Sequence, residues 1–334
     1  MTTTPRGVEI VGVGSALPER VLTNTDLERM MDTSDEWIVQ RTGIRQRHIS
    51  DPKDGPTTTE LATGALGKAL EHAGLGASEL DLVVVATMTP DMPTPSVSCM
   101  VADRVGAGQV GAFDLNGACS GFVFAINTAH DMVRSGSHKT IGVIGADTIT
   151  RFIDYSTYGR GAAILFGDAA GACVIRATDD TSKGVIAQAM HSDASRAKHL
   201  FIPCRGDQFF ESEFDERKLN RVQMNGQAVF KFAVSTFPKL IEQTLEKAGV
   251  QADEVDHYIC HQSNARILTA ARDRFGLSEE KFYINIDRCG NTVAASVPLI
   301  LDELTRAGRI EAGQKIMMLG FGAGLTWGSS LWQI

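Results

Sequence analysis

The chain has 334 residues, of which 43% are apolar and 22% are charged, and its formal net charge is −8. An acidic balance of this size argues against broad nucleic-acid binding, which needs a basic surface to displace counterions from phosphates. No apolar run approaches the ~20 residues that span a bilayer, and the first residues lead into a strand pattern without a signal-peptide core. We therefore expect a soluble, cytoplasmic protein that binds neither nucleic acid nor membrane.

Apolar segments of strand length alternate with segments of helical period along the chain, which predicts a layered α/β architecture. In chain order the clearest strands are expected at residues 82–86, 140–145, 162–166 and 316–319. Six cysteines are scattered along the chain with no CxxC pair, so neither a disulfide framework nor a zinc site is indicated.

An internal repeat divides the chain. Residues 70–81 match residues 245–256 at an offset of 175, and the strand that starts at Thr140 overlies a second one at the same offset. Self-similarity at a fixed offset is the signature of a duplicated unit. We therefore expect two similar halves, residues 1–178 and 179–334.

Two helices between the repeated segments are expected to end at Arg134 and Arg306, an offset of 172 residues. This offset superimposes Cys119 on Asn291 and places each at the start of the helix in its half. Asn is an ordinary capping residue, so Asn291 alone needs no functional explanation.

Cys119 lies in the turn at 116–122, where glycines on both sides allow a tight bend and a helix follows. The start of a helix presents free N–H groups and a partial positive charge, which lower the pKa of a thiol and favour the nucleophilic thiolate. We predict that Cys119 is the reactive cysteine. The alternative, a small core residue, suits Cys99 and Cys173 better.

Two further segments carry groups that suit catalysis. His261 follows an apolar strand, and ligands gather at the carboxyl ends of strands in α/β sheets, although a lone histidine is more often structural. The glycine-rich segment 320–328 can bring backbone N–H groups close to a developing oxyanion, because no side chain keeps the substrate away.

The chain departs from one known sequence motif and matches another. Residues 11–18 begin like a dinucleotide-binding fingerprint, but Leu17 replaces the third glycine and Pro18 follows it. Residues 117–121 match the nucleophile elbow of α/β-hydrolases with Cys in place of Ser, so a cysteine hydrolase is an alternative. That fold would need a buried Asp or Glu before His261 to orient the ring.

Together these segments resemble the β-ketoacyl-[acyl carrier protein] synthase III family of the thiolase-like fold, over residues 8–332. The resemblance rests on short motifs in the same order, namely Asp35–Ile38, Arg41–Ile44, Gly117–Phe122, Phe166–Asp168, His261–Asn264, Gly290–Thr292 and Gly320–Gly328. It implies an α/β thiolase-like duplicated fold in five layers, α-β-α-β-α, and a homodimer.

The resemblance also implies roles for individual residues. Cys119 matches the acylated nucleophile, His261 and Asn291 match the groups that assist decarboxylation, and the backbone N–H groups of Cys119 and Ala323 match the oxyanion hole. The residues implied to bind coenzyme A are Trp37, Arg41, Arg160, Gly226, Lys231 and Asn264. Those implied to contact acyl carrier protein are Gln262, Ser263, Asn264, Ala265 and Arg266, with Arg272 and Arg274 adding positive charge.

The implied reaction starts fatty acid biosynthesis and needs neither a metal nor another cofactor. The Cys119 thiolate takes the acyl group of a primer acyl-CoA, and malonyl-[acyl carrier protein] then loses carbon dioxide to give the enolate that attacks this thioester. Thr94 stands where many acetyl-using members have a Phe that reaches across the dimer to close the acyl pocket. We therefore expect primers longer than acetyl to be accepted.

Two further alternatives share most of these features. A starter-condensing enzyme of polyketide or other secondary metabolism would keep the same three side chains and differ in its pocket and partner. A non-catalytic scaffold would keep only the fold, which the intact set of Cys119, His261 and Asn291 disfavours.

Overall fold

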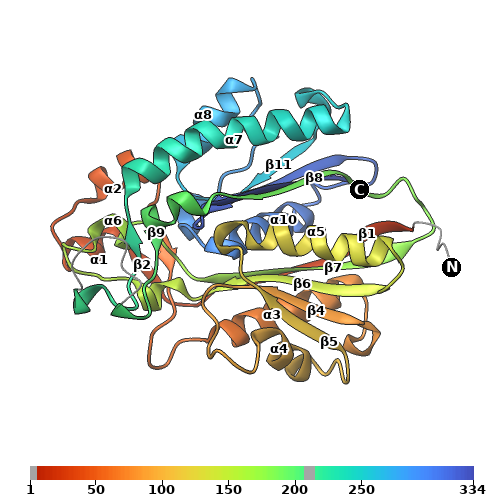
Figure 1. Ribbon diagram of the computed structural model, residues 1–334, viewed down its shortest axis with the longest axis horizontal. Coiled ribbons are helices and arrows are strands. Elements are labelled where there is room, and N and C mark those ends of the chain that lie inside the picture. Colours follow the sequence, from red (N-terminus) through yellow and green to blue (C-terminus); the bar gives the residue numbers. More distant parts are fainter. Residues whose placement is uncertain (1–5, 207–214) are drawn as a thin grey trace.

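The computed structural model of the chain describes residues 6–206 and 215–334 (Figure 1). The elements up to the middle of the chain are β1 (Gly7–Ala16), β2 (Val21–Thr23), α1 (Asn24–Glu28), α2 (Asp35–Thr42), β3 (Gln46–His48), α3 (Thr58–Ala73), β4 (Leu82–Ala86), α4 (Val97–Val105), β5 (Gly111–Leu115), α5 (Gly121–Arg134), β6 (Thr140–Asp147), α6 (Arg160–Ala163) and β7 (Ala169–Thr178). The elements that follow are β8 (Gly184–Ser192), β9 (Leu200–Phe201), β10 (Gln223–Met224), α7 (Gly226–Ala248), β11 (His257–Cys260), α8 (Ala265–Arg274), α9 (Ile286–Cys289), α10 (Ser296–Arg306), β12 (Lys315–Gly322) and β13 (Thr326–Gln333).

The two large sheets repeat one topology. The first has the strand order β1-β7-β6-β4-β5 and the second has the order β8-β13-β12-β11. Parallel pairs β4–β6 and β11–β12 occupy the same place in the two sheets, and antiparallel pairs β6–β7 and β12–β13 lie beside them. Where β5 stands in the first sheet, the second has a single parallel bridge between Tyr258 and Phe282. The duplication read from the sequence is therefore visible in the strand order.

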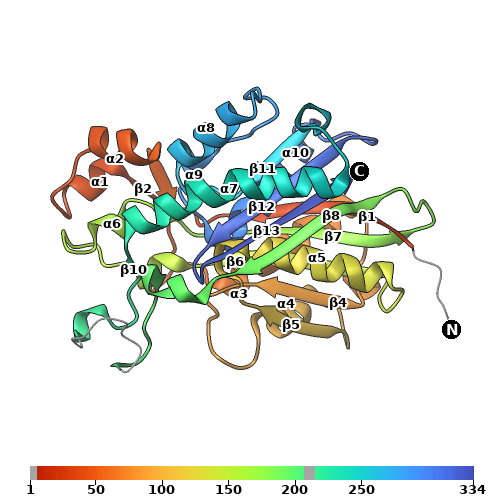
Figure 2. The ribbon, with the colours of Figure 1, turned by 45° about the horizontal axis from the view of Figure 1, so that its top comes forward.

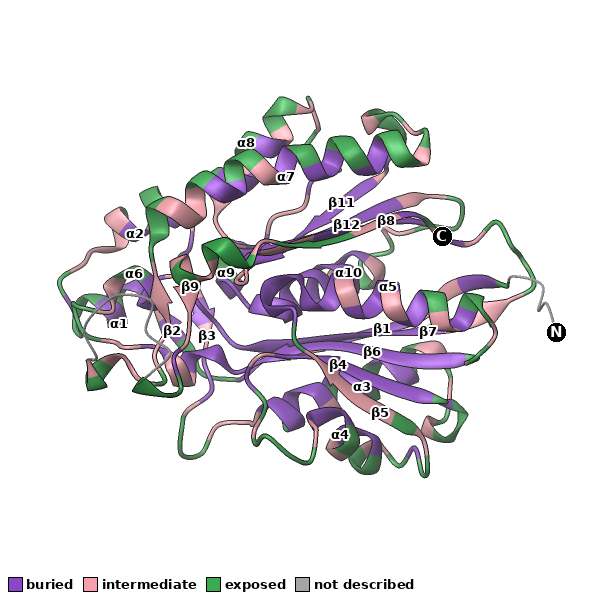
Figure 3. Ribbon diagram, in the orientation of Figure 1, coloured by how far each residue is buried: buried purple, intermediate pink, exposed green. Residues whose placement is uncertain are grey.

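The elements stack in five layers, α-β-α-β-α, so the predicted fold class is confirmed. Helices α3 and α4 cover the outer face of the first sheet, α7 and α8 cover the outer face of the second, and α5 and α10 lie between the sheets (Figures 1 and 2). The central helices are apolar on most sides because both of their faces meet a sheet, as their burial shows (Figure 3).

The repeated sequence motif encodes a helix end. Helix α3 stops at Gly74 (φ 64°) and α7 stops at Gly249 (φ 68°), and in each the N–H of the glycine returns to a carbonyl of the last turn. Glycine adopts this left-handed conformation without the steric penalty of a Cβ, so it ends the helix at the same point in both halves.

The strands expected at 82–86, 140–145 and 316–319 are present as β4 and as parts of β6 and β12. The strand expected at 162–166 is wrong, since the segment forms the short helix α6 and a turn, with one bridge at Phe166. A short apolar run in a buried place has no period that separates helix from strand. We keep the division at residues 178 and 179 as a proposal, because β7 ends at Thr178 and β8 belongs to the other sheet.

The expected superposition of Cys119 on Asn291 is also wrong. The two central helices start at Gly121 and Ser296, an offset of 175, while their ends differ by 172 because α5 has 14 residues and α10 has 11. By the helix starts, Cys119 corresponds to Ala294. Because the two helices differ in length, the offset between their ends does not give the residue that corresponds to Cys119.

Within the described ranges 6–206 and 215–334, no helix is both long and apolar enough to cross a membrane. The same ranges contain no group of three or more His, Cys, Asp or Glu side chains arranged to hold a metal ion.

Candidate active site

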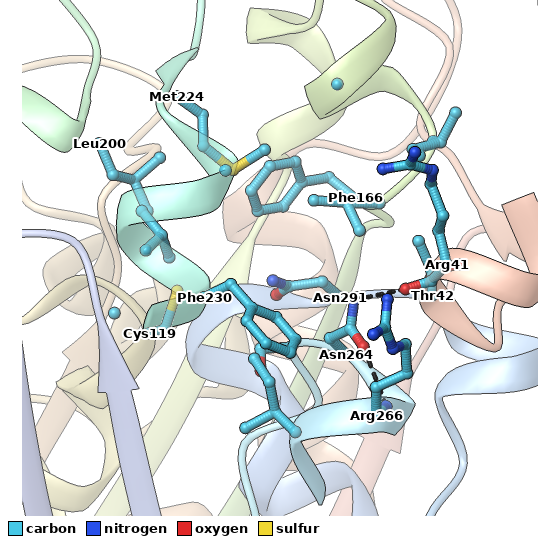
Figure 4. A pocket seen from close by; sticks show the side chains of 18 of the residues that line it. Arg41, Thr42, Cys119, Phe166, Leu200, Met224, Phe230, Asn264, Arg266 and Asn291 are labelled. Atoms are coloured by element: carbon cyan, nitrogen blue, oxygen red, sulfur yellow. Dashed lines mark hydrogen bonds between the residues drawn. The ribbon is translucent and has the colours of Figure 1, made fainter. Parts of the chain in front are cut away.

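A cavity of about 590 Å³ brings Cys119, His261 and Asn291 together, although they are far apart in the sequence (Figure 4). Cys119 comes from the turn before α5, His261 follows β11, and Asn291 precedes the turn into α10. The cavity therefore lies at the carboxyl end of β11, where a layered α/β fold places its ligands.

Cys119 is held in a tight turn that closely approaches β12. Its neighbour Ala118 has φ 47°, and a 3₁₀ turn at Ala118–Ser120 leads directly into α5. On the other side, a Cβ on Gly322 would lie only 2.8 Å from the Sγ atom of Cys119. Glycine is therefore required at this position for the sulfur to sit where it does.

The Cys119 thiol is not ionised in the free protein. Burial and, after it, the nearby Asp147 carboxylate raise its pKa to about 12, although the backbone N–H groups of Ala323 and Cys119 act in the opposite direction. The expectation that the helix start holds a thiolate is therefore wrong. The side chain is only 6% exposed, and loss of water disfavours the charged form more than the turn favours it.

His261 is a buried, neutral imidazole. Its Nδ1 atom lies 3.2 Å from the Ser296 hydroxyl, and Phe321 packs against the ring edge-on with centroids 5.5 Å apart. Burial lowers its pKa to about 3, and a weaker hydrogen bond to the backbone of Val293 opposes that shift. The ring is therefore uncharged and can take part in hydrogen bonds as donor or acceptor.

Asn291 is fixed by backbone contacts from both sides. Its N–H donates to Leu165 O at 2.8 Å, and its carbonyl accepts from the N–H of Gly167 at 3.0 Å. Its side-chain Oδ1 accepts from the N–H of Val293 at 3.0 Å, which turns the Nδ2 end of the amide away from this turn. Figure 4 shows this amide beside Cys119 in the cavity.

The outer part of the cavity is built around Trp37 of α2. The guanidinium carbons of Arg41 and Arg160 lie 4.6 and 4.7 Å from the centroid of its ring. Of the residues expected to bind coenzyme A, the cavity is lined by Trp37, Arg41, Gly226 and Asn264. Arg160 reaches the indole from α6, whereas Lys231 is an exposed residue on α7 outside the cavity lining.

The start of α8 forms one rim of the cavity. Asn264 accepts from the N–H of Arg266 at 2.9 Å and donates to Arg41 O at 2.9 Å, which ties the rim to α2. Arg266 is exposed, and its guanidinium lies 5.4 Å from the centroid of the Phe230 ring. Ser263 lines the cavity, and the adjacent Ala265 is partly exposed.

Three of the residues expected at the carrier-protein surface do not fit it. Gln262 is 1% exposed, and its amide contacts the carbonyls of Cys260 and Tyr283, so its side chain cannot reach a partner. Arg272 is paired with Glu279 and Asp273, and Arg274 with Glu242. Their positive charge is thus largely balanced within the chain.

A second cavity, which the sequence did not indicate, also has Cys119 in its wall. It has about 20 Å³ of space and is walled by Met88, Cys119, Ile149, Phe166, Leu200, Phe201, Ile202, Val222, Val293 and Ala323. Strand β9, which pairs antiparallel with β10, forms part of its wall. Each strand has only two residues, too few for a periodic sequence signal.

Thr94, expected at the acyl pocket, is exposed in the loop between β4 and α4 and is not part of the lining of either cavity within this chain. The hydrolase alternative is also disfavoured, because the described contacts of the His261 ring are a Ser hydroxyl, a backbone group and a Phe ring rather than a carboxylate.

Comparison with known proteins places the chain in a family. The two models of 3-oxoacyl-[acyl-carrier-protein] synthase III match residues 113–194 and 245–334. The β-ketoacyl-[acyl-carrier-protein] synthase III of Xylella fastidiosa is 46% identical over 96% of this chain and 97% of its own, and that of Caldanaerobacter subterraneus is 44% identical over 96% of each.

Solved structures give the same result. The 3-oxoacyl-[acyl-carrier-protein] synthase III of Aquifex aeolicus superimposes with a TM-score of 0.90 at 39% identity, covering 98% of this chain and 100% of its own. A priming β-ketosynthase from a polyketide biosynthetic pathway superimposes with a TM-score of 0.91 at 35% identity, covering 100% and 98%. The chain therefore belongs to the β-ketoacyl-[acyl carrier protein] synthase III family.

Proposed function

We propose that this protein condenses a primer acyl-CoA with malonyl-[acyl carrier protein] and so starts fatty acid biosynthesis. The observation that carries the proposal is the meeting of Cys119, His261 and Asn291 in one cavity, whose outer part carries Trp37 with two guanidinium groups over its ring. Relatives named as β-ketoacyl-[acyl-carrier-protein] synthase III over nearly the whole chain support the same reaction.

In the first stage, Cys119 attacks the thioester carbonyl of the primer and the coenzyme A thiol leaves. Because Cys119 starts as a thiol, its proton must leave as the C–S bond forms, and it ends on the coenzyme A sulfur, which departs as a thiol. The backbone N–H groups of Cys119 and Ala323 already point at the sulfur, which suits them to stabilise the oxyanion.

In the second stage, the malonyl thioester loses carbon dioxide and the resulting enolate attacks the acyl-Cys119. Asn291 Nδ2 donates one hydrogen bond to the thioester oxygen, since its Oδ1 is held by Val293. His261 donates the other from Nε2 when the Ser296 hydroxyl donates to Nδ1. Neither stage requires a metal or a redox cofactor. Acyl transfer between thiols and loss of carbon dioxide to give an enolate need no external electron donor or acceptor.

The substrates enter from the Trp37 side of the large cavity. A planar indole and a guanidinium are suited to hold a purine ring, so we assign coenzyme A to Trp37, Arg41, Arg160, Gly226 and Asn264, with Lys231 outside the lining. We assign the acidic carrier protein to the rim of Ser263, Asn264, Ala265 and Arg266, where local positive charge can act despite the net charge of −8. Soluble substrates of this kind fit the proposed cytoplasmic location.

The acyl chain of the primer is assigned to the small apolar cavity behind Cys119. Its space of about 20 Å³ suits a short acyl group, whereas Thr94 suggests a longer one if a second copy contributes that residue. A homodimer is supported by β5, an edge strand that pairs with β4 on one side only within the described sheet. Transacylation rates with acetyl-CoA and with an eight- to twelve-carbon acyl-CoA decide between the two primer lengths.

Intact mass after incubation with acyl-CoA tests the nucleophile. Cys119→Ala is expected to lose the acyl adduct, while His261→Ala and Asn291→Ala keep it and lose condensation. Cys99→Ala, a change at an exposed cysteine outside the cavity, serves as the control and keeps both. Undiminished labelling of the Cys119 variant would defeat the proposal.

A second candidate within the family is a starter-condensing enzyme of polyketide synthesis, favoured by the likeness to the priming β-ketosynthase. The two candidates differ in the extender partner. Condensation rates with malonyl-CoA and with malonyl-[acyl carrier protein] from fatty acid and polyketide systems separate them.

A further inference from the structure

Ser120 and Thr326 lie in the two motifs that build the nucleophile site, but the proposed reaction gives neither residue a role. Ser120 directly follows Cys119 and is 0% exposed, and Thr326 is the first residue of β13. Their side-chain oxygens lie 3.1 Å apart, although the residues are 206 positions apart in the sequence. The two hydroxyl groups therefore join the two motifs directly.

The hydroxyl of Thr326 contacts both segments at once. Its Oγ1 atom lies 3.1 Å from Gly117 O, at the start of the nucleophile turn, and 2.9 Å from Ala323 O, in the loop between β12 and β13. A threonine hydroxyl has one proton to donate and can also accept from another donor. It therefore donates to one of these carbonyls at a time and can accept from the Ser120 hydroxyl.

The two segments pack backbone against backbone. A Cβ on Gly322 would lie 2.5 Å from the Cβ of Cys119, and a Cβ on Gly320 would lie 2.9 Å from the Cα of Ser120. Cys119 and Ala323 also share the wall of the small apolar cavity. Because no side chains intervene, a small shift of one segment changes the distance between the thiol and the Ala323 amide.

The other hydrogen bonds of the β12–β13 loop lead elsewhere. Leu325 exchanges two backbone hydrogen bonds with Asp193, at 2.8 and 3.1 Å, and Gly322 pairs with Thr326 in the strand ladder. These contacts close the hairpin and tie it to the segment after β8, but they do not reach the nucleophile turn. The Ala323 N–H faces the thiol in the free protein and serves the oxyanion in the proposed reaction, so it cannot hold the segments together throughout.

We propose that Thr326 is a positioning residue, which uses its hydroxyl and that of Ser120 to hold the Ala323 N–H at the distance from Cys119 that acyl transfer requires. The inference rests on the proposed function for the oxyanion, whereas the contact between the two segments does not depend on it. Backbone donors stabilise an oxyanion best when they are fixed before the charge develops. Thr326 lines neither cavity, so it acts through the loop and not on the substrate.

Thr326→Val tests the hydroxyl, because valine keeps the branched shape and loses the oxygen. We expect the saturating rate of Cys119 acylation by acyl-CoA, followed by intact mass, to fall about tenfold, since the oxyanion donor is misplaced. The acyl-CoA concentration that gives half this rate is expected to change little, since binding is unaltered. Thr326→Ser keeps the oxygen and is expected to stay within about twofold of the unmodified protein. Equal losses in the two variants would overturn the proposal, because they would not depend on the hydroxyl.

Thr244→Val is the matched control, because Thr244 of α7 forms a similar pair with Ser329 of β13. Its Oγ1 atom donates to Leu240 O at 2.6 Å and lies 2.7 Å from Ser329 Oγ, and it lines neither cavity. Thr244→Val and Thr326→Val each remove one hydroxyl from such a pair, so both are expected to lower the free energy of unfolding. Only Thr326→Val is expected to slow acylation. An equal fall in acylation in the control would reduce the effect to stability and overturn the proposal.

Ser120→Ala supplies a second variant if Thr326→Val does not fold. Thr326 keeps its contacts to the two carbonyls in this variant, so the saturating rate of acylation is expected to fall only about threefold. An unchanged rate in Ser120→Ala would remove the Ser120 hydroxyl from the device and overturn the proposal in the form given.

Amide hydrogen exchange tests the contact without any substrate. Peptides that cover residues 117–121 and 321–326 are expected to exchange faster in Thr326→Val than in the unmodified protein or in Thr326→Ser, because the link between the segments is lost. Unchanged exchange in both peptides would overturn the proposal even if acylation falls. If the unmodified protein forms no acyl adduct at Cys119, the proposed function fails, while exchange still decides whether Thr326 holds the loop.

Discussion

The starts of the two central helices have the same backbone but carry different chemistry. Ala118 before α5 and Val293 before α10 both have positive φ, 47° and 51°, and each opens a 3₁₀ turn that runs into the helix. In the first half the functional side chain, Cys119, lies inside this turn, whereas in the second half Asn291 lies ahead of it. The two halves thus share a turn next to the cavity, but the functional side chain occupies a different position relative to that turn in each half.

The position of each group relative to its turn determines what the group can do. A thiol inside the turn is near the backbone N–H groups that can receive an oxyanion. An amide ahead of the turn can use the Val293 N–H to fix one end of its side chain and offer the other to substrate.

The largest effect is expected from Asn291→Asp. The carboxylate keeps the acceptor for the Val293 N–H but loses the donor toward the thioester, so condensation is expected to fall about 100- to 1,000-fold. Formation of the acyl-Cys119, followed by intact mass, is expected to change little. If condensation survives in this variant, Asn291 takes no part in the second stage of the reaction.

Gly322→Ala tests the first turn from the side of β12. The added Cβ would lie 2.5 Å from the Cβ and 2.8 Å from the Sγ of Cys119, so the sulfur must move, and acylation is expected to fall about 100-fold. Gly161→Ala is the control, because Gly161 lines the same cavity and its added Cβ would meet nothing within 4 Å. If both variants acylate at the normal rate, the close approach of β12 has no functional meaning.

Trp37→Ala addresses the outer cavity, which belongs to neither turn. Loss of the indole is expected to raise the KM for acyl-CoA about tenfold with little change in kcat, because the ring is assigned to adenine and not to the reacting atoms. The same acyl group on pantetheine, which lacks adenine, provides the comparison. If the KM rises equally for both substrates, Trp37 contributes to folding rather than to binding of adenine.

The smallest effect concerns Asp168, a buried carboxylate whose contacts stay within the first half. Burial raises its folded pKa to about 6 from an ordinary value of 3.8, so the folded protein binds a proton more readily and gains stability as pH falls through 6. Between pH 7 and pH 5, the native protein should gain about 1 kcal/mol of unfolding free energy relative to Asp168→Asn. Denaturant melts at the two pH values measure this, and an unchanged difference would contradict the shift.

Much of the fold follows from local sequence. The helix ends at Gly74 and Gly249 and the buried strands β4, β6 and β12 are encoded by short patterns, so the duplicated α/β architecture was predictable. The short helix α6 and the strands β9 and β10 were not, because they depend on what packs around them.

The site divides in the same way. Residue types and motif order pointed to Cys119, His261 and Asn291, which the structure brings into one cavity. The ionisation of Cys119 could not be read from its turn, because burial and Asp147, a residue 28 positions away, decide it. The inward orientation of Gln262 likewise depends on tertiary contacts with Tyr283 and Asn285.

The contact between Cys119 and the segment Gly322–Ala323 has a consequence for biosynthesis of the chain itself. The thiol is made in the first half, but the glycine that accommodates it and the amide that faces it follow Cys119 by 203 and 204 residues. A nascent or prematurely terminated polypeptide therefore carries the nucleophile without its oxyanion site. The order of translation therefore delays the onset of acyl transfer until Gly322 and Ala323 have been made and have folded against Cys119.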